Sequence, residues 1–166
     1  MVAITPDVKR MMNSQHVILI GTANDQKMPN VSPRSSFYVD NDVIYWYEIF
    51  MHKSYQNFTK NNWVSVSVVD YNDFSGYQLK GHAKIVTDKK EYFHADTRLS
   101  ENLPKNHEEK VRKLILNNDI KIIQFKPLVL YSLNPANFEK APGLLESDVD
   151  LDKLQELEEF SMLDYV

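Results

Sequence analysis

Two groups of consecutive residues in this chain combine positive charge with hydroxyl groups: Arg34, Ser35 and Ser36, and then His52, Lys53 and Ser54. A helix is predicted to begin near Ser54, so its first backbone N–H groups lie beside the second group. Cations, hydroxyl groups and a helix N-terminus together form the combination that binds a phosphate group. We therefore expect an anion-binding site where the two groups meet.

Each cation taken alone has an ordinary explanation. Arg34 fits a surface ion pair at the edge of a sheet, and Lys53 fits a solvated side chain, because a lysine at a helix start opposes the helix dipole. Together with the serines and with Asn57, the two cations favour a bound anion. An anion placed between the lysine and the N–H groups removes the conflict with the dipole.

Other kinds of chemistry are excluded by missing residues or motifs. The chain has no cysteine, which excludes disulfides, thiolate catalysis and cysteine-bound metal or iron–sulfur sites. It contains neither GxGxxG nor GxxxxGK[ST], so side chains must hold any nucleotide. The five histidines form no HExxH or other close pair, so no metal site is predicted. Without a GxSxG motif there is no basis for a serine hydrolase.

Length and charge indicate one soluble domain. The chain has 166 residues, of which 43% are hydrophobic, and this is enough for a single packed core. Its net charge of −4 argues against nucleic-acid binding, which needs a clustered basic surface. The chain does not begin with a basic region and an apolar run, and no stretch approaches the ~18 apolar residues of a membrane span. We expect a cytoplasmic protein that binds neither nucleic acid nor membranes.

A predicted hairpin and the helix after it position the two groups. The first strand carries Arg34 and runs to Val39, where turn residues 40–42 separate it from the apolar and aromatic run at residues 43–47. We expect these two strands to be neighbours. The helix should extend from about residue 54 to residue 61, which places the second group at its start.

The remaining pattern predicts further strands and helices. Strands are expected at residues 16–23, 64–68 and 76–86, and at residues 121–133 with an interruption at Pro127. Helices are expected from Pro6, from about residue 87 to residue 100, and from about residue 106 to residue 116. Gly81 interrupts its strand, which suggests a bulge or a close backbone approach. About six antiparallel strands with peripheral helices predict a mainly β barrel rather than a doubly wound sheet.

The chain divides into a barrel domain at residues 1–135 and a C-terminal extension at residues 136–166. Loop residues begin the extension, and an acidic amphipathic helix is predicted from about Asp148. Its apolar face comprises Leu151, Leu154, Leu157 and Phe160. This face is expected to pack against the barrel or across a dimer, or to recruit a partner.

Four sequence segments carry a resemblance to a known family. They are Pro29–Pro33 (PNVSP), the basic pair His52–Lys53, the run QNFTKNNWVSV at residues 56–66, and LKGHA at residues 79–83. In this order and spacing they resemble the FMN-binding split β-barrel of the pyridoxamine 5'-phosphate oxidase-like superfamily. The resemblance covers roughly residues 8–133.

The resemblance implies a homodimer of split barrels with FMN at the subunit interface. It places residues 34–39 along the flavin, including Arg34, Ser35, Ser36 and Phe37. It also places the aromatic pair Trp46 and Tyr47 at the cofactor and the pair His52 and Lys53 at its phosphate, with Ser54 as an extra donor. The family's glutamine is not at its usual offset, and Gln78 on the same strand face is its expected substitute. Trp46 and Tyr47 equally fit the barrel core or a dimer contact.

Two departures from the family pattern bear on function. His52 stands where an arginine is usual, which removes a bidentate phosphate contact and suggests pH-dependent FMN affinity. The C-terminal arginine and histidine motif of true pyridoxamine phosphate oxidases is absent, so a different substrate is implied.

The expected function is that of an FMN-dependent oxidoreductase. Electrons would pass between a reduced nicotinamide, or a small organic donor, and an acceptor through FMN. No residue stands out as a general acid or base, so a non-catalytic flavin carrier or sensor is an alternative. Another is the same fold holding deazaflavin or haem, with a histidine as axial ligand of the haem.

Overall fold

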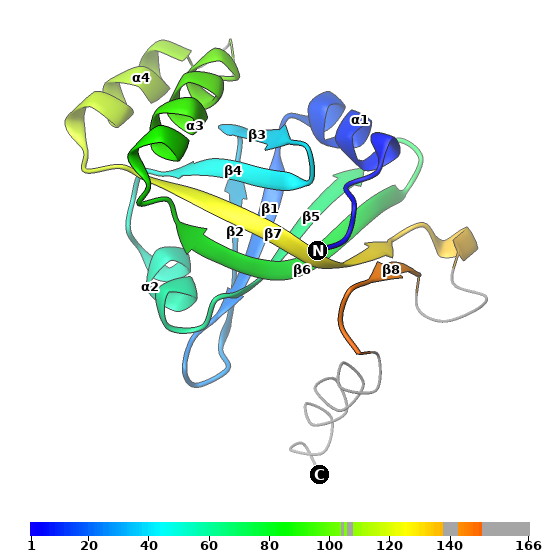
Figure 1. Ribbon diagram of the computed structural model, residues 1–166. Coiled ribbons are helices and arrows are strands. Elements are labelled where there is room, and N and C mark those ends of the chain that lie inside the picture. Colours follow the sequence, from blue (N-terminus) through cyan, green and yellow to red (C-terminus); the bar gives the residue numbers. More distant parts are fainter. Residues whose placement is uncertain (104, 106–107, 138–142, 151–166) are drawn as a thin grey trace.

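The computed structural model describes residues 1–103, 105, 108–137 and 143–150 (Figure 1). Its strands are β1 (Ile18–Ala23), β2 (Pro29–Arg34), β3 (Phe37–Asp40), β4 (Val43–Glu48), β5 (Trp63–Asp70), β6 (Ser75–Ile85), β7 (Lys121–Ser132) and β8 (Leu144–Ser147). Its helices are α1 (Pro6–Gln15), α2 (Lys53–Lys60), α3 (Lys89–Glu101), α4 (Glu108–Asn117) and the short 3-10 helix η2 (Pro135–Asn137). Within these residues, no helix is long and apolar enough to cross a membrane.

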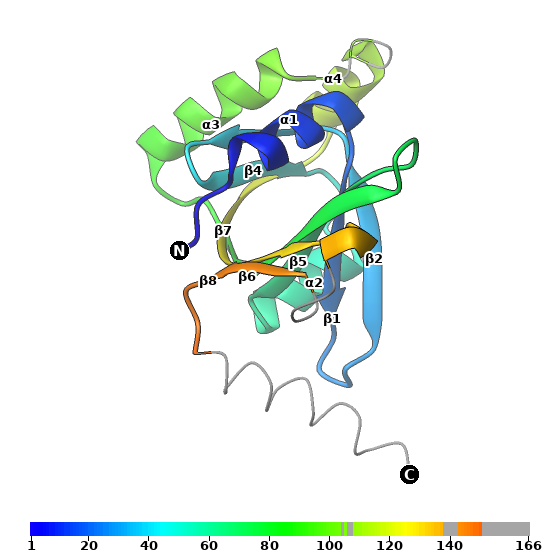
Figure 2. The same cartoon turned by 90° about the vertical axis from the view of Figure 1, so that its right-hand side faces the viewer.

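The strands form one antiparallel sheet whose order explains its shape. The order is β2-β1-β5-β6-β7-β4-β3, and β8 adds to β7. The outermost strands β2 and β3 are consecutive in the chain, with only Ser35 and Ser36 between them. The sheet must therefore curl until its two edges meet, and Figure 2 shows the strands arranged around a central core. This is the mainly β, split-barrel fold that the sequence predicted.

The predicted hairpin is confirmed around its turn, at residues 37–47, and is wrong for the residues before it. β3 pairs with β4, and Asn41 adopts a positive φ of 52° in the turn between them, as expected of a tight Asx-rich turn. Arg34, however, lies on β2, which pairs with β1 rather than with β4. The predicted single strand is bent at Ser35–Ser36, because its two halves pair with opposite edges of the sheet.

The interruption at Pro127 and the irregularity at Gly81 prove to be one feature. β7 is continuous through Pro127, so the two predicted segments are a single strand, and the register of β6 against β7 shifts between Lys80 and Gly81. A Cβ at Gly81 would overlap the carbonyl oxygen of Lys126. The backbones approach so closely here that only glycine fits, which confirms the predicted bulge.

Side chains alternate along β4 between two hydrophobic clusters. Ile44 and Trp46 are fully buried inside the barrel. Tyr45 and Tyr47 point the other way, into a second cluster beneath α3, and the α3–α4 pair lies over this side of the sheet in Figure 1. Glu48, two residues after Trp46, continues the barrel-facing row and ends it in a carboxylate.

The helices begin close to where the sequence predicted. Thr5 caps α1, and Asp88 caps α3 by accepting hydrogen bonds from the N–H groups of Lys90 and Glu91. β8 was not predicted and lies in the C-terminal extension. The predicted apolar face from Leu151 to Phe160 lies outside the described residues, and the division at residue 135 stays a prediction.

Candidate functional site

A cavity of about 490 Å³ lies where β2, the end of β4 and the start of α2 meet. Its polar lining comes from Asn30, Ser32, Arg34, Ser35, Ser36, Glu48, His52, Lys53 and Ser54, and its apolar lining from Pro33, Tyr47, Ile49, Phe50 and Val111. The lining thus combines hydrogen-bond donors and cations with apolar side chains.

The alternation of β2 places its polar residues on the barrel side. Asn30, Ser32 and Arg34 pair in register with residues of β1 that face the core, whereas Val31 on the opposite face is 66% exposed. A strand of sequence PNVSPR therefore presents amide, hydroxyl and guanidinium groups in a row along one side. α2 packs against both β1 and β2, so this row faces the helix.

The N-terminus of α2 has no side-chain cap. His52 occupies the N-cap position but makes no capping hydrogen bond, and the first turn holds no acidic residue. The first N–H groups of a helix have no intrahelical partner and carry partial positive charge. Lys53 begins the helix and lines the cavity, so its charge adds to that of the helix terminus.

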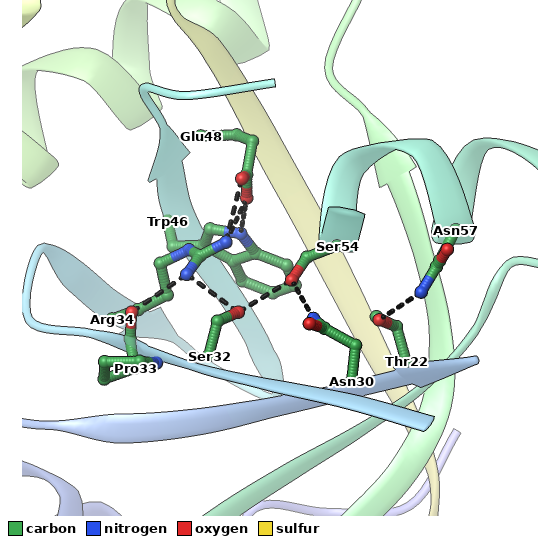
Figure 3. Close-up of polar contacts among 9 residues, drawn as sticks. All are labelled: Thr22, Asn30, Ser32, Pro33, Arg34, Trp46, Glu48, Ser54 and Asn57. Carbon is green, nitrogen blue, oxygen red and sulfur yellow. Dashed lines mark hydrogen bonds and ion pairs between the residues drawn. The ribbon is translucent and has the colours of Figure 1, made fainter. Parts of the chain in front are cut away.

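Arg34 is held by a buried carboxylate that the sequence reasoning missed. Its Nη2 donates to both carboxylate oxygens of Glu48, at 2.8 and 2.7 Å, as Figure 3 shows. The Glu48 side chain is 4% exposed and that of Arg34 16%. Trp46 Nε1 lies 3.3 Å from Glu48 Oε2 and donates to it. The sequence held only a weak sign of this pair: Glu48 ends the apolar run VIYWYE two residues after Trp46, on the same face of the strand.

A second set of contacts links Arg34 to α2. Arg34 Nη1 donates to Ser32 Oγ at 3.0 Å and to the carbonyl oxygen of Pro33 at 2.9 Å. The Oγ atoms of Ser32 and Ser54 lie 2.7 Å apart, and Asn30 Nδ2 donates to Ser54 Oγ at 2.9 Å (Figure 3). The chain of contacts thus runs from β4 through β2 to the first turn of α2. These contacts connect β2, at one edge of the sheet, to β4, next to the other edge.

The structure gathers most of the predicted site residues around this cavity. Those that line it are Arg34, Ser35, Ser36, Tyr47, His52, Lys53 and Ser54. Asn30, Ser32 and Glu48 also line it and were not predicted. Arg34, at the end of β2, and Lys53, at the start of α2, therefore line one cavity.

The other predicted residues lie elsewhere. Phe37 and Trp46 belong to the hydrophobic core inside the barrel. Asn57 is buried and donates from Nδ2 to Thr22 Oγ1 at 3.0 Å, beside a neighbouring cavity of about 500 Å³ that shares Asn30 and Lys53. Gln78 lies next to the fully buried Leu79 on β6 and therefore faces outward.

The aromatic wall of the cavity includes a tyrosine anchored to α3. The Tyr47 hydroxyl donates to Asp96 Oδ1 at 2.6 Å and lies 3.1 Å from Ser100 Oγ. Burial, and then the hydrogen bond to Asp96, raise the pKa of Tyr47 well above 10.0, so the phenol stays protonated. His52 stacks on Phe50 with ring centroids 5.8 Å apart. In the part of the chain that the structure describes, no three His, Asp or Glu side chains gather to hold a metal ion.

A comparison with protein-family models identifies one family. The family model described as pyridoxamine 5'-phosphate oxidase matches residues 4–132. No curated protein sequence matches the chain.

Several solved structures share the fold. HupZ from Group A Streptococcus is 18% identical with a TM-score of 0.63, over 81% of this chain and 96% of that one. HutZ, the haem storage protein from Vibrio cholerae, is 16% identical with a TM-score of 0.63, over 78% and 94%. A protein related to general stress protein 26 from Clostridium acetobutylicum is 19% identical with a TM-score of 0.59, over 76% and 84%.

Proposed function

This chain belongs to the pyridoxamine 5'-phosphate oxidase family, and from that premise we propose that it binds FMN in the cavity between β2 and α2 and acts as an oxidoreductase. When bound, FMN supplies the electron and hydride transfer, between a reduced nicotinamide or small organic donor and an acceptor. The residues of the chain bind the cofactor, orient it and shield it from water. The sequence lacks the C-terminal arginine and histidine motif with which true pyridoxamine phosphate oxidases grip their substrate, so a different substrate is proposed.

The observation that carries this proposal is the uncapped start of α2 beside Lys53 and the Ser32–Ser54 pair. A phosphate monoester needs a cation, hydroxyl donors and free N–H groups, and all three meet here. Lys53 is the main cation for the phosphate. The charge of Arg34 is already compensated by Glu48 at 2.7 Å, so Arg34 acts by holding neighbouring groups in place.

The rest of the cavity suits a planar ring. Tyr47, Ile49, Phe50 and Val111 supply its apolar wall, which favours a flat aromatic system over a polar sugar. Regular strand pairing stops after Arg34 and resumes at Phe37. The backbone N–H groups of Ser35 and Ser36 are therefore available to donate to the polar edge of the ring, and they favour negative charge there.

A homodimer with FMN near the interface is part of the proposal. Gln78 faces outward on β6, away from the cavity of its own chain, so it reaches a flavin only across an interface between two copies. Light scattering of the purified protein tests this arrangement, and a monomer with bound flavin would contradict it.

Haem is the second candidate ligand, and the observation that favours it is the place of His52. Among the described histidines, His52 alone lines the cavity, where its imidazole is available as an axial ligand. The likeness to HutZ, a haem storage protein, adds support at the level of the fold.

The absorption spectrum of the freshly purified protein separates these candidates. Flavin bands support FMN, and a Soret band supports haem. The affinity for added FMN is then measured by quenching of flavin fluorescence. Oxidation of NADH or NADPH with an artificial acceptor then distinguishes an enzyme from a carrier, because a carrier binds FMN without turnover.

Lys53→Ala tests the phosphate contact. We expect FMN to bind about tenfold to a hundredfold more weakly, because a hydrogen bond to a charged group is lost. Lys60→Ala is the control, since Lys60 lies at the other end of the same helix and pairs with Asp25 at 2.8 Å. The double variant Arg34→Ala, Lys53→Ala should release flavin, and its fold is checked by circular dichroism because the change also leaves the buried Glu48 carboxylate without its partner. Unchanged affinity in this double variant would contradict the site.

A further inference from the structure

The hydroxyl groups of Ser32 and Ser54 share one hydrogen bond and receive two more from outside. Their Oγ atoms lie 2.7 Å apart. Arg34 Nη1 donates to Ser32 Oγ at 3.0 Å, and Asn30 Nδ2 donates to Ser54 Oγ at 2.9 Å. Both outside partners are N–H groups, so each fills an acceptor site on a hydroxyl oxygen and takes up no hydroxyl proton.

The serine pair keeps one hydroxyl proton that it can offer to a ligand. Each serine hydroxyl has a single proton and accepts through two lone pairs. The bond between the serines uses one proton, and whichever serine donates it, the other serine keeps its own. Among the hydrogen bonds of the described residues, that second proton has no acceptor. Both serines line the cavity, so the pair presents a donor there, and the ligand atom it suits is an acceptor such as a phosphate oxygen.

Glu48 determines which way Arg34 points. A guanidinium group only donates, and Arg34 Nη2 donates to the two oxygens of Glu48 at 2.8 and 2.7 Å. This contact holds Nη2 at the carboxylate, while Nη1 of the same planar group donates to Ser32 Oγ and to the carbonyl oxygen of Pro33. Glu48 itself is 3% exposed and accepts a further hydrogen bond from Trp46. The buried side chain of Glu48 therefore anchors Arg34, which begins a relay of hydrogen bonds from Arg34 to Ser32 and on to Ser54.

We propose that Glu48 is a positioning residue for a phosphate monoester bound at the N-terminus of α2. Glu48 orients Arg34, Arg34 fills the acceptor site of Ser32, and the Ser32–Ser54 pair donates its remaining proton to a phosphate oxygen. The inference rests on the proposed function of the cavity and deepens it. It names the residues by which the site would bind FMN more tightly than riboflavin, which lacks the phosphate. Glu48 does not touch the ligand and acts only through Arg34.

A comparison of FMN with riboflavin isolates the phosphate contribution. Dissociation constants for both flavins are measured by fluorescence quenching for the wild type, Glu48→Gln, Ser54→Ala and the double variant. We expect Glu48→Gln and Ser54→Ala each to weaken FMN about tenfold and to change riboflavin less than twofold. The double variant should bind FMN about as weakly as either single variant, because both changes break the same relay.

The control is Glu101→Gln, which removes a carboxylate from an exposed arginine pair, Arg98–Glu101. It should leave both dissociation constants unchanged. If Glu48→Gln weakens FMN and riboflavin equally, or if its effect adds fully to that of Ser54→Ala, the inference is overturned, because Glu48 then acts on the general shape of the cavity.

If Glu48→Gln does not fold, a second variant tests the same contact. Arg34→Lys keeps the charge beside Glu48 but removes the Nη1 donor to Ser32, and it should lower the preference for FMN over riboflavin by a similar factor. An unchanged preference overturns the inference. If the wild type binds neither flavin, the proposed function fails. The same variants are then titrated with inorganic phosphate, where an unchanged dissociation constant in Glu48→Gln overturns the inference independently.

Discussion

Two buried polar clusters lie on opposite faces of β4, and they differ in how completely their hydrogen bonds are made. On the barrel face, Glu48 accepts from Arg34 and from Trp46, and the contacts continue to Ser54. On the other face, Tyr45 donates to Glu91 at 3.0 Å, and Tyr47 donates to Asp96. In this second cluster the buried atoms Tyr38 Oη and Gln124 Oε1 have no partner.

The difference indicates distinct roles for the two faces. The barrel-facing cluster contains a compensated charge pair and opens onto the cavity, so its order determines which donors meet a ligand. The tyrosine cluster is covered by α3 and fastens that helix to the sheet. Buried but incompletely paired phenols cost stability. The first cluster is therefore the one to test through ligand binding, and the second through stability.

The largest effect is expected where the charge pair is broken. Glu48→Ala leaves the guanidinium of Arg34 without its carboxylate, and the free energy of unfolding should fall by about 3–5 kcal/mol. Replacing both partners with apolar residues, in Arg34→Met with Glu48→Leu, should restore stability to within about 1 kcal/mol of the wild type while FMN affinity stays low. Urea denaturation gives the stability. A loss below about 1 kcal/mol in Glu48→Ala would show that Arg34 does not depend on Glu48.

An intermediate effect is expected from pH acting on Tyr47. Its pKa is raised in the folded protein above the value of 10.0, so above pH 10 the unfolded chain loses this proton while the folded protein keeps it. The stabilisation is therefore complete below pH 10 and is lost as the pH rises toward the folded pKa. Urea midpoints between pH 8 and about pH 11 measure the decline.

Tyr47→Phe is the matched variant for this pH effect. It should cost about 1–2 kcal/mol at neutral pH, because the hydrogen bond to Asp96 is lost, and it should make the decline above pH 10 shallower. FMN affinity should change less than twofold, since the ring still lines the cavity. An identical decline in the variant would show that Tyr47 is not the group responsible.

The smallest effects on stability are expected at two stacked tyrosines in the second cluster. The rings of Tyr38 and Tyr45 lie 5.1 Å apart and nearly parallel. Tyr38→Phe removes a buried hydroxyl without a partner and should raise the free energy of unfolding by up to about 1 kcal/mol. Tyr45→Phe removes a hydroxyl bonded to Glu91 and Gln124 and should lower it by about 1 kcal/mol. Equal effects in thermal denaturation would contradict this assignment.

Local features of the fold were predictable because neighbouring residues determine them. The turn at residues 40–42, the closeness of β6 and β7 at Gly81, and the start of α2 near Ser54 all follow from short patterns. The bend at Ser35–Ser36 was not, because nothing in the local sequence shows that residues on its two sides pair with different strands.

Some of the cavity residues were likewise predictable from the sequence, and others were not. The basic residues and serines attracted attention by type and spacing, and six of them line one cavity: Arg34, Ser35, Ser36, His52, Lys53 and Ser54. Tyr47, which the resemblance placed at the cofactor, lines it too. Glu48 did not attract attention, because a single acidic residue after an apolar strand has no distinctive pattern. Trp46 was placed at the cofactor by resemblance, whereas in the structure it is fully buried and meets the site through Glu48.

The amino-acid sequence by itself determined which strands alternate, where the chain turns and which segment carries the donors for an anion. Only the tertiary structure decided that Arg34 meets Glu48 and that Ser32 meets Ser54. These contacts join residues on β2, β4 and α2, and they arise because the curled sheet brings its two edges together. Such closure depends on the pairing of strands far apart in the chain, such as β4 with β7, and periodicity indicates which face a side chain takes but not which partner it finds.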